Sequence, residues 1–352
     1  MSIDGNPQVL IIGSGAIANE LAAAYAQLGL EPVVGSLASA ANLKPRLIVT
    51  ATDDFDLEEL RGVAEATGAE TVPTIEASEL TANRQRTRAS ANEDLGLPTL
   101  EHEFVTDPAQ LGESAERIGF PCVVKPGRST AGNGQSVVRE PGELEGAYAV
   151  AREASPSDCV VVERFIEFDS EVTILAVRSV DPATGELATW FCEPIGTRHE
   201  RGRLVESWQP AQLTEAAMDN ARSIAARVTG AMNSCGVHSV ELFIDGEEVY
   251  FSQATPRPTL DGMVTRATQR LDQFELHARA SLRLPIDATL ISPGASQLVP
   301  TDGRAVTTEC LARAMAVEET GAQVLNSSLL MRSTGETAEE ARERAARAAA
   351  AL

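Results

Sequence analysis

Lysine is nearly absent from this sequence: only Lys44 and Lys125 occur among its 352 residues, and every other basic side chain is arginine. Acidic residues outnumber basic ones, which gives a formal net charge of −22. A field of this sign repels nucleic acid and anionic membranes at long range, so we expect neither as a partner. An anionic small molecule would instead need a local cluster of arginine or lysine.

Cysteine pairs and long apolar runs are also missing. The cysteines are odd in number and have no CxxC spacing, which argues against a disulfide framework and a thiolate zinc site. No stretch approaches the ~20 apolar residues that span a bilayer, and residues 1–20 lack the basic and apolar segments of a secretory signal. We expect a cytoplasmic protein with single buried cysteines: Cys122, Cys159, Cys192, Cys235 and Cys310.

The first part of the chain alternates strand-like and helical patterns. A short apolar strand at 9–13 ends in Gly13-Ser14-Gly15, and a helical pattern follows. The turn lacks the third glycine of a dinucleotide-binding fingerprint, because Ala18 stands there, so we expect a tight turn or a substrate pocket rather than NAD. The alternation predicts a doubly wound parallel sheet of about 80 residues, with strands at 31–34, 47–50 and 71–72 and a helix at 56–67.

The middle of the chain has a different pattern. Strand-like runs there are separated by turns, and Asp245-Gly246 between two such runs is a strong hairpin signal. This predicts an α+β unit with antiparallel strands at 122–125, 137–139, 159–163, 171–177, 237–243 and 248–251, followed after Pro293 by a smaller segment that ends in a helix at 337–352.

Lys125 ends an apolar run, residues 121–126, that is typical of a buried strand. A lysine ammonium is a compact charge on a flexible stem, which suits a phosphate oxygen in a tight pocket. The next segment, residues 127–135, is rich in glycine and small polar residues, whose backbone N–H groups can surround other phosphate oxygens. Strand, lysine and loop together predict a nucleoside triphosphate site.

Further segments are expected to complete this site. Residues 161–166 read as a strand that runs into a hinge, where backbone groups can bond adenine, and Glu171 follows as a carboxylate for the ribose. Glu241 and Gln253 lie on the two strands of the hairpin, and oxygen ligands on adjacent strands can hold Mg²⁺ between phosphates. Arg257, between two prolines, would meet the transferred phosphoryl group.

The residue pattern by itself assigns no role in the site to the other charged and titratable side chains. Arg84, Arg86 and Arg88 form a cluster on an expected helix, and such a run is usually a solvated face, as we expect for Arg86 and Arg88. The histidines have no ligand spacing, and we expect surface or core positions for all of them: His102, His199, His238 and His277.

The strings around these residues are distinctive as an ordered set. They include residues 118–126 (IGFPCVVKP), 206–210 (ESWQP), 240–243 (VELF), 256–258 (PRP) and 262–265 (GMVT). In this order they resemble the ATP-grasp superfamily and, within it, the formate-dependent phosphoribosylglycinamide formyltransferases. The resemblance implies an α/β pre-ATP-grasp domain at 1–80, an ATP-grasp domain at 81–290 with its nucleotide-binding lid at about 115–170, and a small C-terminal domain at 291–352.

The resemblance also implies a reaction of purine biosynthesis. ATP would phosphorylate formate, and the amine of glycinamide ribonucleotide would attack the resulting formyl phosphate, with Mg²⁺ and arginine stabilising the phosphoryl charge. It further implies a homodimer. Matched position by position, it implies catalytic roles for Lys125 and Arg257, metal ligation by Glu241 and Gln253, and ATP contacts for Arg84, Lys125, Thr130, Ala131, Gly132, Asn133, Gly134, Gln135, Glu163, Arg164, Phe165, Ile166 and Glu171.

The chain departs from the family pattern at its metal and acceptor positions. Gln253 stands at the second magnesium glutamate, and Asn133 stands at the usual lysine of the loop. Residues 16–17 (Ala-Ile) replace a Glu-Leu pair that contacts the ribonucleotide, residues 259–261 (Thr-Leu-Asp) replace His-Asp-Thr, and a segment with a lysine and an Arg-Arg pair is missing near 326–332. Two alternatives therefore stay open: an ATP-grasp carboxylate–amine ligase with a different acceptor, and a catalytically impaired paralogue that binds ATP or ADP.

Overall fold

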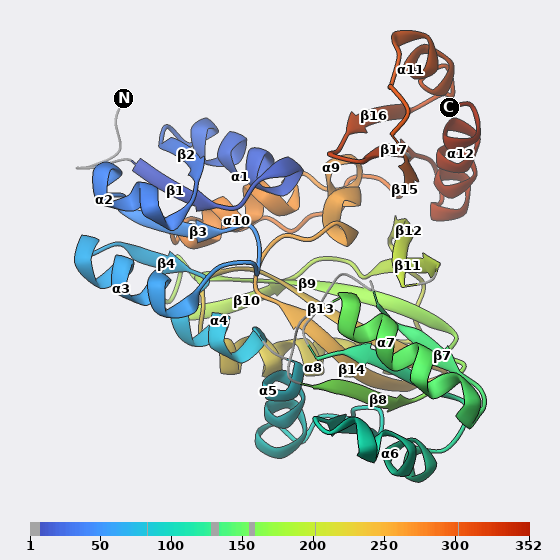
Figure 1. The fold of residues 1–352 in the computed structure, drawn as a ribbon. Helices are drawn as coiled ribbons and strands as arrows, with labels where there is room; N and C mark the ends of the chain where they lie inside the picture. Colours follow the sequence, from blue (N-terminus) through green and yellow to red (C-terminus); the bar gives the residue numbers. More distant parts are fainter. Residues whose placement is uncertain (1–7, 83, 128–133, 155–158, 201, 302) are drawn as a thin grey trace.

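The computed structural model describes residues 8–82, 84–127, 134–154, 159–200, 202–301 and 303–352 (Figure 1). Its N-terminal sheet is four-stranded and parallel, in the order β2-β1-β3-β4. Helices cover both faces, which is why the strands are nearly continuous apolar runs. The expected doubly wound sheet is confirmed: β1 (Gln8–Ile12), β2 (Glu31–Gly35), β3 (Leu47–Thr50) and β4 (Glu70–Val72) alternate with α1 (Gly15–Gln27), α2 (Ala40–Leu43) and α3 (Leu57–Thr67).

The covering helices are fixed by local signals and by one distant element. Asp56 caps α3 by accepting a hydrogen bond from the Glu59 N–H at 2.9 Å, and Gly68 ends it with a φ of 71°. A later helix, α10 (Gln273–Ser281), packs beside α1, where Tyr25 Oη and Ser281 Oγ are 2.6 Å apart. A helix from far along the chain therefore helps to cover one face of the N-terminal sheet.

A second sheet carries the predicted phosphate lysine. It is antiparallel, in the order β5-β8-β6-β7, and two helices bury its apolar face. Its elements are β5 (His102–Val105), α6 (Leu111–Ile118), β6 (Cys122–Pro126), β7 (Ser136–Val138), α7 (Leu144–Ala154) and β8 (Val160–Arg164). Two short helices, α4 (Ile75–Thr81) and α5 (Arg84–Ala89), connect the N-terminal sheet to this unit, and a π-helical turn follows at Ser90–Asp94.

The third sheet is the largest and runs along the chain into its last segment. Its strand order is β14-β13-β9-β11-β12-β15-β17-β16, with β10 added beside β9. The helix α8 packs on one face, and α10 packs on the other. The elements are β9 (Ser170–Val180), β10 (Leu187–Phe191), β11 (Ile195–Glu200), β12 (Arg203–Gln209), α8 (Glu215–Met232), β13 (Gly236–Asp245), β14 (Glu248–Thr255) and α9 (Thr265–Thr268).

The C-terminal segment continues this third sheet by hydrogen bonding. β15 pairs with β12, so the last strands share a sheet with the central ones, while the boundaries of the three expected domains remain predictions. None of the helices in the described part of the chain is both long and apolar enough to cross a membrane. The closing elements are β15 (Gly294–Pro300), α11 (Thr308–Ala314), β16 (Thr320–Val324), β17 (Ser328–Thr334) and α12 (Ala338–Ala350).

Candidate active site

The predicted phosphate lysine lies in a buried ion-pair network. Lys125 on β6 and Glu163 on the neighbouring β8 are joined by a bond of 3.0 Å from Lys125 Nζ to Glu163 Oε2. Arg88 Nη2 donates to both oxygens of the same carboxylate, at 3.1 and 3.2 Å. Burial raises the pKa of Glu163. The positive charges of Lys125 and Arg88 have a larger effect in the opposite direction, so the pKa is lowered to about 2. One ionised carboxylate therefore faces two cations.

Arg88 corrects an expectation from the sequence. We expected a solvated helix face, but its side chain is only 3% exposed. Besides Glu163, it donates from Nη1 to the Phe251 carbonyl at 3.1 Å, which fastens α5 to β14. Both partners lie far along the chain, so a local charge pattern contains no signal for this burial.

Arg84, one helical turn before Arg88, adds a third cation. Its Nε is buried and has no hydrogen-bond partner in the part of the chain that the structure describes. Burial lowers the pKa of Arg84, and also that of Lys125, while the Glu163 carboxylate acts in the opposite direction on both. Three cations thus gather around one ionised carboxylate, and a buried surplus of positive charge is costly unless an anion balances it.

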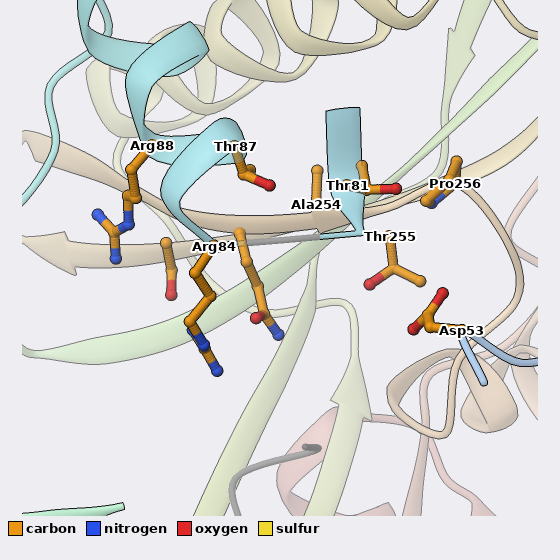
Figure 2. Close-up of a pocket in the computed structure, with 10 residues that line it drawn as sticks. Asp53, Thr81, Arg84, Thr87, Arg88, Ala254, Thr255 and Pro256 are labelled. Carbon is orange, nitrogen blue, oxygen red and sulfur yellow. The ribbon is translucent and has the colours of Figure 1, made fainter. Parts of the chain in front are cut away.

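These arginines open onto a pocket, here called the arginine pocket. Figure 2 shows Arg84 and Arg88 extending from α5 along one side of it, with Asp53 on the other side. Gln253, on β14, is also in the lining, so the predicted metal position and the cation cluster share one space. The lining residues are Asp53, Thr81, Arg84, Thr87, Arg88, Ser252, Gln253, Ala254, Thr255 and Pro256.

The two predicted metal ligands are cross-strand partners. Glu241 on β13 pairs in register with Gln253 on β14, and Gln253 Nε2 donates to Glu241 Oε1 at 2.7 Å. Burial, together with the Asp261 carboxylate, raises the pKa of Glu241 to about 7. No group of three or more His, Cys, Asp or Glu side chains among the described residues is placed to hold a metal. The pair fits Mg²⁺ only as a partial set, because this ion commonly takes one or two carboxylates plus phosphate and water oxygens.

Glu171, the predicted ribose ligand, has a histidine partner. Its Oε2 lies 2.5 Å from Nδ1 of His199 on β11. Burial lowers the pKa of His199, but Glu171 outweighs it, so the pKa lies above its ordinary value. The buried Asp261 accepts a bond from Thr173 Oγ1 at 3.2 Å, and Thr173 is the register partner of Glu241. Sequence reasoning gave no role to His199 or Asp261, whose neighbours are set by strand pairing.

The structure describes only some of the remaining residues that are predicted to contact the nucleotide. Arg164 ends β8 with an exposed side chain that reaches Glu101 at 3.3 Å. Phe165 donates its N–H to the Pro121 carbonyl at 3.4 Å, and Ile166 follows it. Gly134, before Gln135, has a φ of 80°, and a Cβ there would lie 2.3 Å from the Ala154 Cβ. Thr130, Ala131, Gly132 and Asn133 lie outside the described residues.

Arg257 is held by a residue that sequence reasoning did not single out. Its guanidinium forms an ion pair with Asp53, in which Nε donates to Oδ1 at 3.2 Å. Asp53 lies three residues beyond β3, in the loop at the carboxyl end of a parallel strand. Open α/β sheets bind ligands at this position. The place of Asp53 after a parallel strand was therefore a signal in the sequence that could have identified it. The pair joins the loop after β3 to the segment after β14.

A second pocket, the strand-end pocket, lies at the carboxyl ends of β1, β2 and β3. It is adjacent to the arginine pocket, because Thr52 and Asp54 line it while Asp53 lines the other. Its lining residues are Ile12, Gly13, Ser14, Ala16, Ile17, Gly35, Ser36, Leu37, Ala38, Ala51, Thr52, Asp54, Phe55, Asp56, Glu59, Leu260, Leu298, Leu325, Asn326, Ser327 and Ser328.

Solved structures share this fold. A glycinamide transformylase T from Mycobacterium tuberculosis is 34% identical, with a TM-score of 0.83 over 98% of this chain and 99% of that chain. A carboxyaminoimidazole ribonucleotide synthase from Aspergillus clavatus, solved with ATP, is 18% identical with a TM-score of 0.85, covering 98% of each chain. At that identity the second likeness shows the fold alone.

Sequence comparison leads to the same group. The ATP-grasp domain profile matches residues 90–274. Formate-dependent phosphoribosylglycinamide formyltransferases are similar along nearly the whole chain: the one from Corynebacterium efficiens is 43% identical over 98% of this chain and 95% of its own length. The one from Paraburkholderia xenovorans is 38% identical, with the same coverage. The chain therefore belongs to the ATP-grasp superfamily and, within it, to the family of the formate-dependent phosphoribosylglycinamide formyltransferases.

Proposed function

We propose that the protein uses ATP to convert formate into formyl phosphate and transfers the formyl group to an amine. A formate oxygen attacks the γ-phosphorus, and the bond from that phosphorus to the bridging oxygen of ADP breaks. The amine nitrogen then attacks the formyl carbon, inorganic phosphate leaves, and the nitrogen gives up a proton. Relatives that carry this activity in their names align with nearly the full chain, which supports the proposal.

The observation that carries it is the surplus of positive charge beside the arginine pocket, into which Arg84 and Arg88 open. Arg84, Arg88 and Lys125 surround Glu163, whose single negative charge cannot balance them. A triphosphate would supply the missing negative charge. Lys125 and Arg84 would bind its oxygens, while Arg88 holds the Glu163 carboxylate in place for Lys125.

Glu241 and Gln253 would hold Mg²⁺ by one carboxylate and one amide oxygen, with phosphate oxygens completing the shell. Bound there, the ion would neutralise charge on the transferred phosphoryl group. Arg257, oriented by Asp53, would stabilise the same charge from the side of the strand-end pocket. The hinge at Glu163 to Ile166 would take adenine through its backbone, and Glu171 would take the ribose.

An assay that replaces the amine substrate with hydroxylamine tests this reaction. We would measure ADP release from Mg·ATP with formate and hydroxylamine, because hydroxylamine traps an acyl phosphate as a hydroxamate. We expect ADP and formyl hydroxamate in equal amounts, and neither product without formate. ADP binding without any formate-dependent turnover would instead identify an impaired paralogue, which the carboxylate–amide metal pair keeps as the second candidate.

Assembly and location are separate parts of the proposal. By family likeness we expect a cytoplasmic homodimer, built from a pre-ATP-grasp domain at 1–80, an ATP-grasp domain at 81–290 and a C-terminal domain at 291–352. Sedimentation equilibrium tests the dimer: a mass near 37.3 kDa, that of a single chain, would contradict it.

A further inference from the structure

Glu171 and His199 lie on neighbouring strands of the third sheet, close to the predicted phosphate lysine. Glu171 on β9 pairs in register with Phe243 on β13, so the two side chains leave the sheet on the same face. Lys125, which belongs to the second sheet, places its Nζ 5.9 Å from the centroid of the Phe243 ring. Glu171 therefore borders the space between the two sheets in which Lys125 lies.

The opposite face of these strands is filled by a helix. Val240 and Leu242 on β13 pack with Ile224 of α8 in one hydrophobic cluster. On the face toward Lys125, by contrast, the side chains of Glu171 and His199 remain 25% and 27% exposed. Their polar atoms therefore stay accessible to a ligand that enters between the sheets.

The backbone of β11 directs His199 toward Glu171. Thr197 is the register partner of Glu171, and His199 follows it by two residues, which places the histidine at a diagonal position within reach of the glutamate. The pairing of β11 with β12 shifts its register between Arg198 and His199. Such a bulge changes the direction of the side chains beside it. The outcome is the 2.5 Å contact between His199 Nδ1 and Glu171 Oε2.

This contact occupies one carboxylate oxygen and leaves the other. A carboxylate only accepts hydrogen bonds, so His199 Nδ1 carries the hydrogen and donates it to Oε2. Among the residues that the structure describes, Oε1 of Glu171 has no hydrogen-bond partner. A free glutamate side chain loses rotamer freedom when it binds a ligand. The bond to His199 orders Glu171 before the ligand arrives, which reduces that cost.

The chemistry of Oε1 favours a hydroxyl group as its ligand. A carboxylate oxygen accepts a strong, charge-assisted hydrogen bond from a hydroxyl, whereas it repels a phosphate oxygen. The cations that attract phosphate, Lys125 and Arg84, belong to the Glu163 network. A nucleotide with its phosphates at that network and a ribose hydroxyl at Glu171 satisfies both ends.

We propose that His199 is a positioning residue for the ribose of the nucleotide: it holds Glu171 Oε2, so that Oε1 accepts a hydrogen bond from a ribose hydroxyl. The inference rests on the proposed use of ATP at this site. His199 acts through Glu171 and does not itself contact the nucleotide. The preference for a ribonucleotide over a deoxyribonucleotide therefore depends on both residues.

Deoxynucleotides test the ribose contact. We would titrate ADP, 2′-deoxyADP and 3′-deoxyADP into the full-length protein with Mg²⁺ in a calorimeter. We expect ADP to bind about tenfold more tightly than at least one of the two analogues, because a charge-assisted hydrogen bond is missing there. Glu171→Gln should reduce this ratio to about two- to threefold. Equal affinities for the three nucleotides, or no binding of ADP, would overturn the inference.

Two substitutions of His199 test its role in the ratio of ADP affinity to analogue affinity. His199→Phe keeps a ring but removes the donor, so the ratio should fall to about two- to threefold. His199→Asn keeps an N–H group near the position of Nδ1, so it should preserve the ratio to within about twofold. If both variants gave the same ratio, or if His199→Phe weakened all three nucleotides equally, His199 would have only a structural role and the inference would fail.

A matched histidine supplies the control. His238 lies on β13 of the same sheet, and its place two residues before Val240 puts its side chain on the α8 face. His238→Phe should leave the ratio unchanged. The same loss of ratio in His238→Phe and His199→Phe would attribute it to the sheet as a whole and contradict the inference.

A double variant separates positioning from direct contact. In a protein that already carries Glu171→Gln, the further change His199→Phe should not alter the ratio, because His199 acts only through the glutamate. An additional loss of at least about threefold would show that His199 itself contacts the ribose, and the positioning role would be wrong.

The hydroxylamine assay distinguishes this inference from the proposed reaction. Hydroxamate formation reports on formyl phosphate, whereas the affinity ratio reports on the ribose contact alone. If hydroxamate forms and the ratio is independent of His199, the reaction stands and the inference fails. If the ratio depends on His199 while no hydroxamate forms, the inference stands and the proposed reaction fails.

Discussion

The guanidinium of Arg257 and the carboxylate of Asp53 form an ion pair between residues 204 positions apart, on the boundary between two pockets. If Arg257 stabilises the phosphoryl charge, Arg257→Gln should lower kcat for hydroxylamine-trapped turnover about 100- to 1000-fold. Asp53→Asn should lower kcat about tenfold, because the guanidinium keeps its charge but loses its orientation.

A surface pair supplies the control for this experiment. Arg270 Nε and Asp287 Oδ2 lie 3.3 Å apart, and the side chains of Arg270 and Asp287 are 62% and 36% exposed. Asp287→Asn should leave kcat and the KM for ATP unchanged. If Arg257→Gln behaved like this control, Arg257 would have only a structural role in joining the two segments.

The scarcity of lysine makes a clean test of the phosphate site. Lys125→Gln should weaken ATP binding about ten- to a hundredfold, because a charge-assisted hydrogen bond to a phosphate oxygen is lost. Lys44, the only other lysine, follows α2 in a left-handed conformation with a φ of 48°. Lys44→Gln should not change ATP affinity, measured by calorimetry. Equal affinity of both variants and the unaltered protein would remove Lys125 from the phosphate site.

Local patterns predicted the elements that depend on local chemistry. The βαβ alternation, the Asp245-Gly246 turn and the placement of Glu241 and Gln253 on the two strands that flank it could be read directly from strand period and turn residues. Their exact pairing could not, because a register shift between Glu241 and Leu242 places Gln253 opposite Glu241. Lys125 was identifiable because a lone lysine at the end of an apolar strand is unusual.

Contacts between distant segments could not be predicted in this way. Arg88 was expected in solvent. It is buried instead, because its partner Glu163 lies on β8, far along the chain from α5. The pairing of Asp53 with Arg257, and of β12 with β15, likewise depends on tertiary packing that no local period encodes.

The amide at Gln253 gives a gain-of-function test. Gln253→Glu adds a second carboxylate next to Glu241, so it should strengthen Mg²⁺-dependent ADP binding roughly tenfold, since ligand charge tunes such sites. Without metal it should lower the free energy of unfolding by about 1–3 kcal/mol, because the 2.7 Å bond to Glu241 is lost. Gln110→Glu, at an exposed position, is the control. Unchanged metal dependence would show that residue 253 does not ligate Mg²⁺.

Two buried histidines predict how stability depends on pH. Burial lowers the pKa of His238 to about 4 and that of His277 to about 3, from an ordinary value of 6.5. The unfolded chain therefore binds more protons than the folded one below pH 6.5, so the free energy of unfolding should decrease as pH falls from about 6.5 towards 4. Each neutral histidine contributes up to about 1.4 kcal/mol per pH unit in this window.

Urea unfolding at a series of pH values measures this dependence. Both side chains are fully buried, and His277 Nδ1 accepts a bond from the Val237 N–H at 3.1 Å, so His238 is the better site to change. His238→Phe should reduce the slope between pH 6.5 and 4 by about 1.4 kcal/mol per pH unit, whatever it does to stability at pH 8. A slope equal to that of the unaltered protein would mean that His238 is already charged, or exposed to solvent, in the folded state.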